Sequence, residues 1–333
     1  KIMNIWIEAI RPKTLIASLS PVLIGASLAY AAITSSSAPL ANEMHRYLYS
    51  DNKLLAGNFY MGPGSVSFLF WVVFLACIIF AVSIQIGTNF ANDYIDYIKG
   101  VDTKARKGPR RAVQSGLIDV KTMKKATFLI FAISALIGVF LLIIGGWVIG
   151  LLALLAIVTG YLYTGGPYPL SYLGLGDLCV LIFFGPVATA GVFYLLTHQI
   201  SLHVIILGFG PGLMSTALLI MNNIRDYETD KLTMKKSLPV RFGIKFGKWE
   251  YSICLILATL VLCYAAFIIN IGYFIYAFII FLIYAAVILK NVRSSFNSSD
   301  FEKIFKKTGI MLTFYTITFS ILALLHDYQS LPK

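Results

Sequence analysis

Residues 126–163 read ATFLIFAISALIGVFLLIIGGWVIGLLALLAIVTGYLY and contain no charged side chain. A helix needs about 20 predominantly apolar residues to cross the hydrocarbon core of a bilayer. This run is long enough for two crossings, so the sequence predicts helices over 126–145 and 147–163, joined by a tight turn at 145–147. An apolar run of this length indicates a membrane protein.

The rest of the chain has the same character. Of its 333 residues, 58% are hydrophobic and 13% are charged, whereas a soluble domain carries about 25% charged residues. The runs do not alternate in polarity as barrel strands do, so helices must satisfy the backbone in lipid. We therefore predict an all-α, polytopic membrane protein that forms one domain over residues 1–333. Its nine apolar runs are 14–34, 66–91, 126–145, 147–163, 178–197, 203–223, 250–269, 271–289 and 308–325.

The net charge of +12 is distributed as membrane topology requires. If the N-terminus is inside and nine helices follow, 24 of the 27 Lys and Arg residues fall in inside segments. This is the positive-inside pattern, and it argues against nucleic acid as a partner. The basic excess can also attract an anionic substrate or lipid headgroup. We expect an integral, multi-pass protein whose N-terminus and long loops 92–125 and 224–249 are cytoplasmic.

The two long inside loops each begin with an acidic cluster, and loops of this length are usually functional or disordered. The clusters read NDYIDY from Asn92 and NNIRDY from Asn222, with Asn, Asp and Tyr at the same positions. They are 130 residues and four spans apart, as an ancient repeat of a four-helix unit would give. The repeat predicts that both clusters reach the same membrane face. The outside loop 35–65 shows no recognisable chemistry.

Each acidic cluster gathers oxygen ligands on one helix face, because an Asn is followed by an Asp four residues later. Carboxylates at a helix C-terminus repel one another and oppose the helix dipole. Mg²⁺ would offset that cost, since it prefers carboxylate oxygen and bridges to substrate phosphates. The alternative is that these acids pair with nearby Lys and Arg in solvated loops. The predicted metal ligands are Asn92, Asp93, Asp96, Asp102, Asn222, Asp226 and Asp230.

Basic side chains follow both acidic clusters, in residues 104–111 and 235–241. A diphosphate that carries Mg²⁺ needs carboxylates for the metal and cations for its remaining oxygens. We predict Arg106, Arg111 and Lys235 as diphosphate ligands, the alternative for each being a topology signal alone. No GxxxxGK[ST] or GxGxxG motif is present, so nucleotide binding has no support.

Tyrosines gather at the inside ends of the spans, and Tyr163 is one of them. Such residues are common as an interfacial belt. Aromatic faces also stabilise a cation without attacking it, so Tyr163 is a candidate for lining a site at which an allylic carbocation forms.

The chain resembles the UbiA superfamily of intramembrane prenyltransferases along nearly its whole length. The double Asp motif carries the resemblance, together with RPKT from Arg11, the stretch from Tyr163 to Pro169 and GLGD from Gly174. The runs GVDT, GPRRAVQSG and NNIRD are similar to the naphthoate (MenA) type, in which the last acid of the first motif stands where Asp102 does. Two departures are the long loop 35–65 and Ser237, where the family usually has Thr.

The resemblance implies about nine helices around a central cavity and Mg²⁺ as cofactor. It implies transfer of a polyprenyl group from polyprenyl diphosphate to 1,4-dihydroxy-2-naphthoate, with loss of CO₂, to give demethylmenaquinol in menaquinone biosynthesis. The expected partners are these two substrates and membrane lipid. Arg11 or Lys13 could bind the acceptor carboxylate, the alternative being a snorkelling anchor. The catalytic carboxylates would be Asp93, Asp96, Asp226 and Asp230.

Two other readings stay open at this point. One is a member of the same superfamily with another acceptor, such as 4-hydroxybenzoate or a futalosine-pathway compound. The other is a secondary transporter, since internal repeats and intramembrane acids occur there too. Transporter acids tend to lie near the bilayer midplane, whereas these lie at the inside ends of two spans. The sequence leaves the isoprenoid chain length, the oligomeric state and any general base undetermined.

Overall fold

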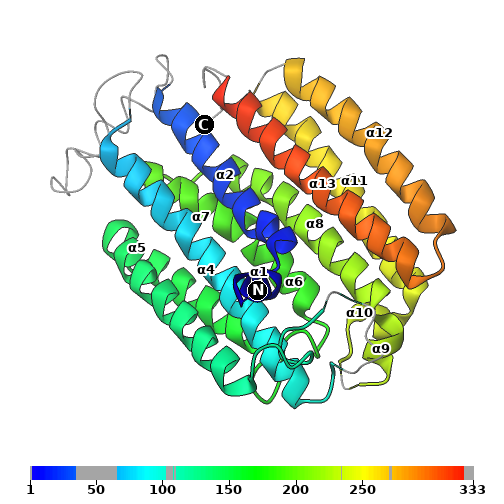
Figure 1. Ribbon diagram of the computed structural model, residues 1–333. Coiled ribbons are helices and arrows are strands. Elements are labelled where there is room, and N and C mark those ends of the chain that lie inside the picture. Colours follow the sequence, from blue (N-terminus) through cyan, green and yellow to red (C-terminus); the bar gives the residue numbers. More distant parts are fainter. Residues whose placement is uncertain are drawn as a thin grey trace.

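The computed structural model of the protein describes residues 2–34, 66–102, 108, 110–233, 235–269 and 272–325. Within these ranges the regular structure is helical, as predicted, and Figure 1 shows the long helices side by side in one bundle. Loop 35–65 and the candidate Arg106 lie outside the described residues. The helices are α1 (Ile2–Ile10), α2 (Pro12–Thr34), α4 (Phe68–Ile98), α5 (Val120–Leu162), α6 (Gly176–Phe183), α7 (Pro186–Thr197), α8 (Leu202–Arg225), α9 (Tyr227–Lys231), α10 (Leu238–Phe242), α11 (Ile244–Ile269), α12 (Gly272–Ser294) and α13 (Ser298–Leu324).

Eight segments of the described chain are long and apolar enough to cross a membrane, with α6 and α7 counted as one. The longest, α5, has 43 residues and would measure about 65 Å if straight, twice the thickness of a bilayer core. It is a hairpin instead. Gly146 has a φ of +77°, which glycine adopts without strain. A Cβ built on Gly138 would lie 3.5 Å from the Cβ of Ala153, so the two predicted helices pack against each other.

Helices α2 and α8 form the centre of the bundle. In each, 78% of the most apolar window is buried, against 28% for α4 and α12. Helix α2 packs against α7 and α13, and α8 packs against α11 and α13. The crossing of α2 and α7 is very close, because a Cβ on Gly25 would lie only 2.5 Å from the backbone oxygen of Thr189.

Both acidic clusters lie at the same end of the bundle, the lower end in Figure 1, where α9 and α10 follow α8. Helix α4 ends at Ile98, and Gly100, with a φ of +69°, turns the chain back. The N–H groups of Val101 and Asp102 then bond the Asp96 carbonyl at 2.9 and 3.3 Å. This turn brings Asp102 back towards Asp96, although Asp102 lies beyond the helix.

The short helix α1 is set apart from α2 by Arg11, which has a φ of +56°. Proline lacks an N–H and has a preset φ, so Pro12 suits the first position of α2. Helix α1 rests on α4 through Trp6 and Phe90, whose ring centroids are 5.5 Å apart. The break at Arg11 places this residue beside the acidic end of the bundle interior.

Candidate functional site

A cavity of about 310 Å³ runs up the interior of the bundle from its acidic end. Polar groups from both clusters line that end, and apolar side chains line the rest. Along α4 the lining extends from Asp96 to Cys77, a distance of about 28 Å at 1.5 Å per residue. The lining reaches Leu141 and Ile149, on either side of the α5 hairpin turn. The cavity therefore suits a long apolar molecule with a polar head.

Asp96 is the centre of the first cluster. Its side chain is buried, and one carboxylate oxygen accepts a hydrogen bond of 2.8 Å from the hydroxyl of Tyr172. The other accepts one of 3.2 Å from Arg111, whose Nε lies 3.1 Å from Asp102. Arg111 is also buried. It therefore neutralises two acids at once, and both Arg111 and Asp96 face the cavity.

Asp93 lies elsewhere. It is 1% exposed, and its two oxygens accept 3.0 Å hydrogen bonds from the backbone N–H groups of Ala112 and Val113. It does not belong to the cavity lining. The sequence predicted Asp93 as a metal ligand and a catalytic carboxylate, but the helix directs it towards the loop that carries Arg111. This geometry is that of a residue that fixes the loop.

The second cluster is organised by Arg225, which the sequence analysis did not select. Its guanidinium donates to both oxygens of Asp226 at 2.8 and 2.9 Å and to Asn222 Oδ1 at 2.6 Å. It also bonds Glu302 of α13 at 2.7 Å. The Arg225 side chain is 1% exposed. Asn222 and Asp226 both line the cavity, whereas Arg225 does not. Arg225 therefore fixes these two side chains from outside the cavity lining.

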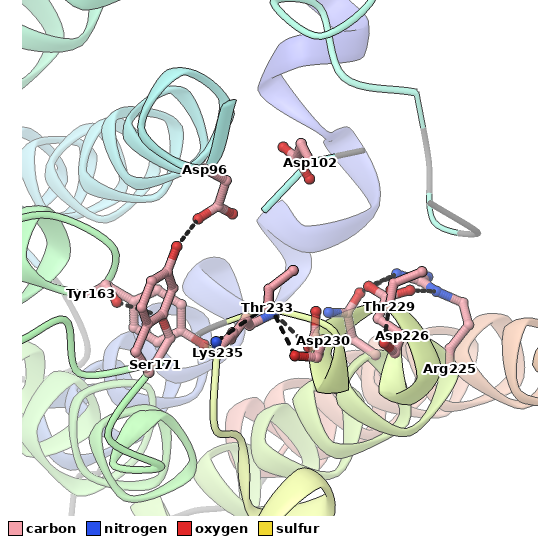
Figure 2. Close-up of polar contacts among 12 residues, drawn as sticks. Asp96, Asp102, Tyr163, Ser171, Arg225, Asp226, Thr229, Asp230, Thr233 and Lys235 are labelled. Atoms are coloured by element: carbon pink, nitrogen blue, oxygen red, sulfur yellow. Dashed lines mark hydrogen bonds and ion pairs between the residues drawn. The ribbon is translucent and has the colours of Figure 1, made fainter. Parts of the chain in front are cut away.

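Lys235 links the two clusters. Its ammonium lies 3.0 Å from Asp230 and borders the cavity. Burial acts to lower the pKa of Lys235, but the carboxylates of Asp230, Asp96 and Asp226 together raise that pKa above its usual value. One ammonium thus interacts with acids of both clusters. Figure 2 shows Asp96 and Asp102 on one side, and Lys235, Asp230 and Asp226 on the other.

Burial and neighbouring charges also shift the pKa values of two further groups at this end of the bundle. Burial raises the pKa of Asp230, and Lys235 opposes that shift. Burial and the charge of Asp96 raise the pKa of the Tyr172 hydroxyl, so Tyr172 remains a hydrogen-bond donor to Asp96.

The donor set fits Mg²⁺ bound together with a phosphate. The cavity end presents carboxylates of Asp96 and Asp226 and amides of Asn92 and Asn222, all of which offer hard oxygen. No three acidic, His or Cys side chains of the described chain form a cage ready to hold a metal by themselves. That agrees with the habit of Mg²⁺, which is commonly held by one or two carboxylates plus substrate phosphates.

The two candidates for acceptor binding near the N-terminus differ in their position relative to the cavity. Arg11 lines the cavity, whereas Lys13 is exposed and does not. Beside Arg11, the Asn89 amide donates to the Ile10 carbonyl at 2.8 Å and to the Thr14 hydroxyl at 3.2 Å. Tyr163 also lines the cavity.

Several polar contacts at the site were not foreseen from the sequence. They join residues far apart in the chain: Tyr172 with Asp96, Arg225 with Glu302, and Thr164, whose hydroxyl bonds the Asn92 side chain. Arg225 stands inside the NNIRD run, so its place in that motif was the available signal. Nothing local marks Glu302, which lies 77 residues away.

The chain was compared with known proteins. The model of the UbiA prenyltransferase family matches residues 54–321. The 1,4-dihydroxy-2-naphthoate octaprenyltransferase of Haemophilus influenzae is 35% identical over 271 residues, which are 80% of this chain and 77% of that protein. The Escherichia coli enzyme of the same name is 32% identical over 79% of this chain and 75% of that protein.

Solved structures share the fold. A UbiA homologue from Archaeoglobus fulgidus, bound to GPP and Mg²⁺, superposes with a TM-score of 0.60 at 14% identity, over 96% of this chain and 99% of that one. A UbiA homologue from Aeropyrum pernix K1 gives a TM-score of 0.61 at 12% identity, over 92% and 98%.

The helical bundle, its charged cavity mouth and these matches define an intramembrane prenyltransferase. The chain belongs to the UbiA prenyltransferase family.

Proposed function

We propose that this enzyme transfers a polyprenyl group from polyprenyl diphosphate to 1,4-dihydroxy-2-naphthoate, with loss of CO₂, in menaquinone biosynthesis. Relatives at 35% and 32% identity are named 1,4-dihydroxy-2-naphthoate octaprenyltransferase. The GVDT, GPRRAVQSG and NNIRD runs support the same acceptor. Other acceptors, including 4-hydroxybenzoate, become outcomes of the test below.

One observation carries the proposal: acids of both clusters, Asp96 and Asp226, line one apolar cavity together with Arg111 and Lys235. A diphosphate head placed there would meet oxygen ligands for a metal and cations for its own oxygens. The apolar tail would extend up the cavity, where its methylene groups stay out of water.

We assign the residues as follows. Asp96 and Asp226, with Asn92 and Asn222, would hold Mg²⁺ on the diphosphate, and Mg²⁺ would draw electron density from the leaving oxygen. Arg111 and Lys235 would bind the remaining phosphate oxygens. Asp102 and Asp230 orient these two cations through contacts of 3.1 and 3.0 Å. Asp93 positions the loop of Arg111 through its two N–H contacts.

Arg11 would bind the acceptor carboxylate, because it borders the cavity while Lys13 does not. A guanidinium matches a carboxylate in a two-pronged geometry. The ring of Tyr163 would face the forming allylic cation, which aromatic faces stabilise. The helix ends that carry the site are also where the basic residues gather, so we place the site on the cytoplasmic side.

The experiment is transfer activity in membranes with Mg²⁺, polyprenyl diphosphate and 1,4-dihydroxy-2-naphthoate. Asp96→Asn and Asp226→Asn should each lower the rate by at least about 100-fold, the scale for loss of one electrostatic stabiliser. Glu228→Gln is the matched control, because Glu228 lies between Asp226 and Asp230 but is exposed. EDTA should abolish activity and excess Mg²⁺ should restore it.

Normal turnover in both Asn variants would refute the metal role. A faster rate with 4-hydroxybenzoate than with the naphthoate would refute the acceptor while leaving prenyl transfer intact.

A further inference from the structure

Two acidic side chains outside the diphosphate site have buried oxygens without a partner. Asp177, at the start of α6, is 4% exposed, and its Oδ1 has no hydrogen-bond partner in the described chain. The same holds for Oε2 of Glu250, in the second turn of α11. Neither carboxylate forms an ion pair with a described residue. Each buried, unsatisfied polar group in a native structure calls for an explanation such as a catalytic role.

The charge of Asp177 acts on Glu250, and the charges of both acids act on Cys254. The ammonium of Lys235 also acts on Asp177, from the cavity side. A buried carboxylate whose oxygen has no partner is costly to keep ionised. Such a group can take up a proton and give it back.

Tyr163 connects the pair to the cavity. It lines the cavity, and Asp177 is the charged group that acts on it most strongly. The Tyr163 hydroxyl lies only 3.1 Å from where a Cβ on Gly176 would stand. Gly176 directly precedes Asp177, so the absence of a side chain at position 176 lets the hydroxyl approach the start of α6.

We propose that Asp177, reached through the Tyr163 hydroxyl, accepts the hydroxyl proton of the aromatic acceptor during prenyl transfer. This inference rests on the proposed function. As the acceptor O–H bond breaks, its electron pair forms a C=O bond and a ring π pair forms the new C–C bond. The electrons of the prenyl C–O bond leave with diphosphate. The proton passes to the Tyr163 oxygen, and the proton of Tyr163 passes to Asp177.

Glu250 is the second member of the relay. It is half-buried, whereas Asp177 is buried. The proton returns to the acceptor oxygen when loss of CO₂ restores the aromatic ring. The relay then ends each turnover in its starting state.

The test compares two rates in the full-length enzyme: transfer to 1,4-dihydroxy-2-naphthoate, and release of diphosphate from polyprenyl diphosphate without an acceptor. Asp177→Asn should lower the first by about 100-fold or more, the usual scale of general acid–base catalysis, and leave the second within about threefold. The transfer rate of Asp177→Asn should approach that of the wild type as the assay pH rises, because the acceptor hydroxyl then ionises without a base.

An equal loss of both rates, or a transfer deficit that does not change with pH, would overturn the inference. Tyr163→Phe tests the path independently, because it removes one oxygen and keeps the ring. It should lower the ratio of transfer to release as Asp177→Asn does, whereas Tyr168→Phe, at a position 75% exposed, should not. Unchanged transfer in Tyr163→Phe would refute the relay. If the wild type releases no diphosphate and transfers nothing, the proposed function itself fails.

Discussion

Replacing Arg225 by methionine tests how the second cluster is held together. Arg225 is the most completely buried cation at the site, at 1% exposure, and it bonds Asp226 twice, Asn222 once and Glu302 once, at 2.6 to 2.9 Å. Methionine keeps most of the aliphatic volume but removes the guanidinium that bonds both carboxylates.

Removing one partner of a buried ion pair costs about 3–5 kcal/mol, because the remaining charge stays buried. Asp226 is 4% exposed and stays out of water, whereas the Glu302 side chain is 30% exposed and recovers part of its hydration. We therefore expect Arg225→Met to lower the free energy of unfolding by about 3–5 kcal/mol. The measurement is an SDS titration in mixed micelles followed by circular dichroism.

Lys306→Met is the matched control. Lys306 also faces Glu302, but at 3.9 Å and with 54% exposure, so its loss should change stability by less than about 1 kcal/mol. In a double-mutant cycle, Arg225→Met and Glu302→Gln should couple by about 0.5–3 kcal/mol. A loss below about 1 kcal/mol in Arg225→Met, or no coupling, would show that Asp226 does not depend on this cation.

Three further predictions follow from named contacts. Asp93→Asn turns an NH₂ group towards one of the two N–H donors, so it should free the loop that carries Arg111. The KM for polyprenyl diphosphate should then rise by a larger factor than kcat falls. A fall in kcat larger than the rise in KM would refute a positioning role. Gly25→Ala should lower the free energy of unfolding by about 1–3 kcal/mol through overpacking against Thr189. Gly191→Ala is the control and should not, because nothing lies within 4 Å of its Cβ. Unfolding titrations of both variants are the measurement. The pKa of Lys235 is raised, so its positive charge is lost only as pH rises through a value above the usual lysine pKa. Asp230→Asn should therefore shift the alkaline loss of diphosphate binding to lower pH. An unchanged pH for that loss would count against the pairing of Lys235 with Asp230.

Hydropathy was sufficient to predict the spans, because the energy that places a helix in lipid is local to its own residues. The turn at 145–147 was predicted for the same reason, and Gly146 provides it. The break between α6 and α7 at Gly185 was not predicted. It depends on a close approach to α8, where a Cβ on Gly185 would meet the Gly208 oxygen at 3.0 Å.

Helical spacing was enough to predict that both acidic clusters lie at helix ends, but not which way each side chain faces. Asp93 and Asp96 are three residues apart on α4, yet Asp96 faces the cavity and Asp93 faces a loop. That difference is set by neighbours distant in the chain. Tyr172 bonds Asp96 from 76 residues away, and no local pattern encodes such a contact.

The balance of charge at the cavity mouth explains why both loops supply acid and then base. Arg111, Arg225 and Lys235 contribute three cations, against five carboxylates in contact with them: Asp96, Asp102, Asp226, Asp230 and Glu302. Within these described ion pairs the acids outnumber the cations, so the excess carboxylates would repel a bare diphosphate in a region of low dielectric. A divalent cation reverses that repulsion, because the carboxylates then act as its ligands and the cations are free to bind phosphate oxygen. On the proposed function, metal and diphosphate must therefore enter as one unit, and the ion pairs seen here are the resting partners that both exchange on binding.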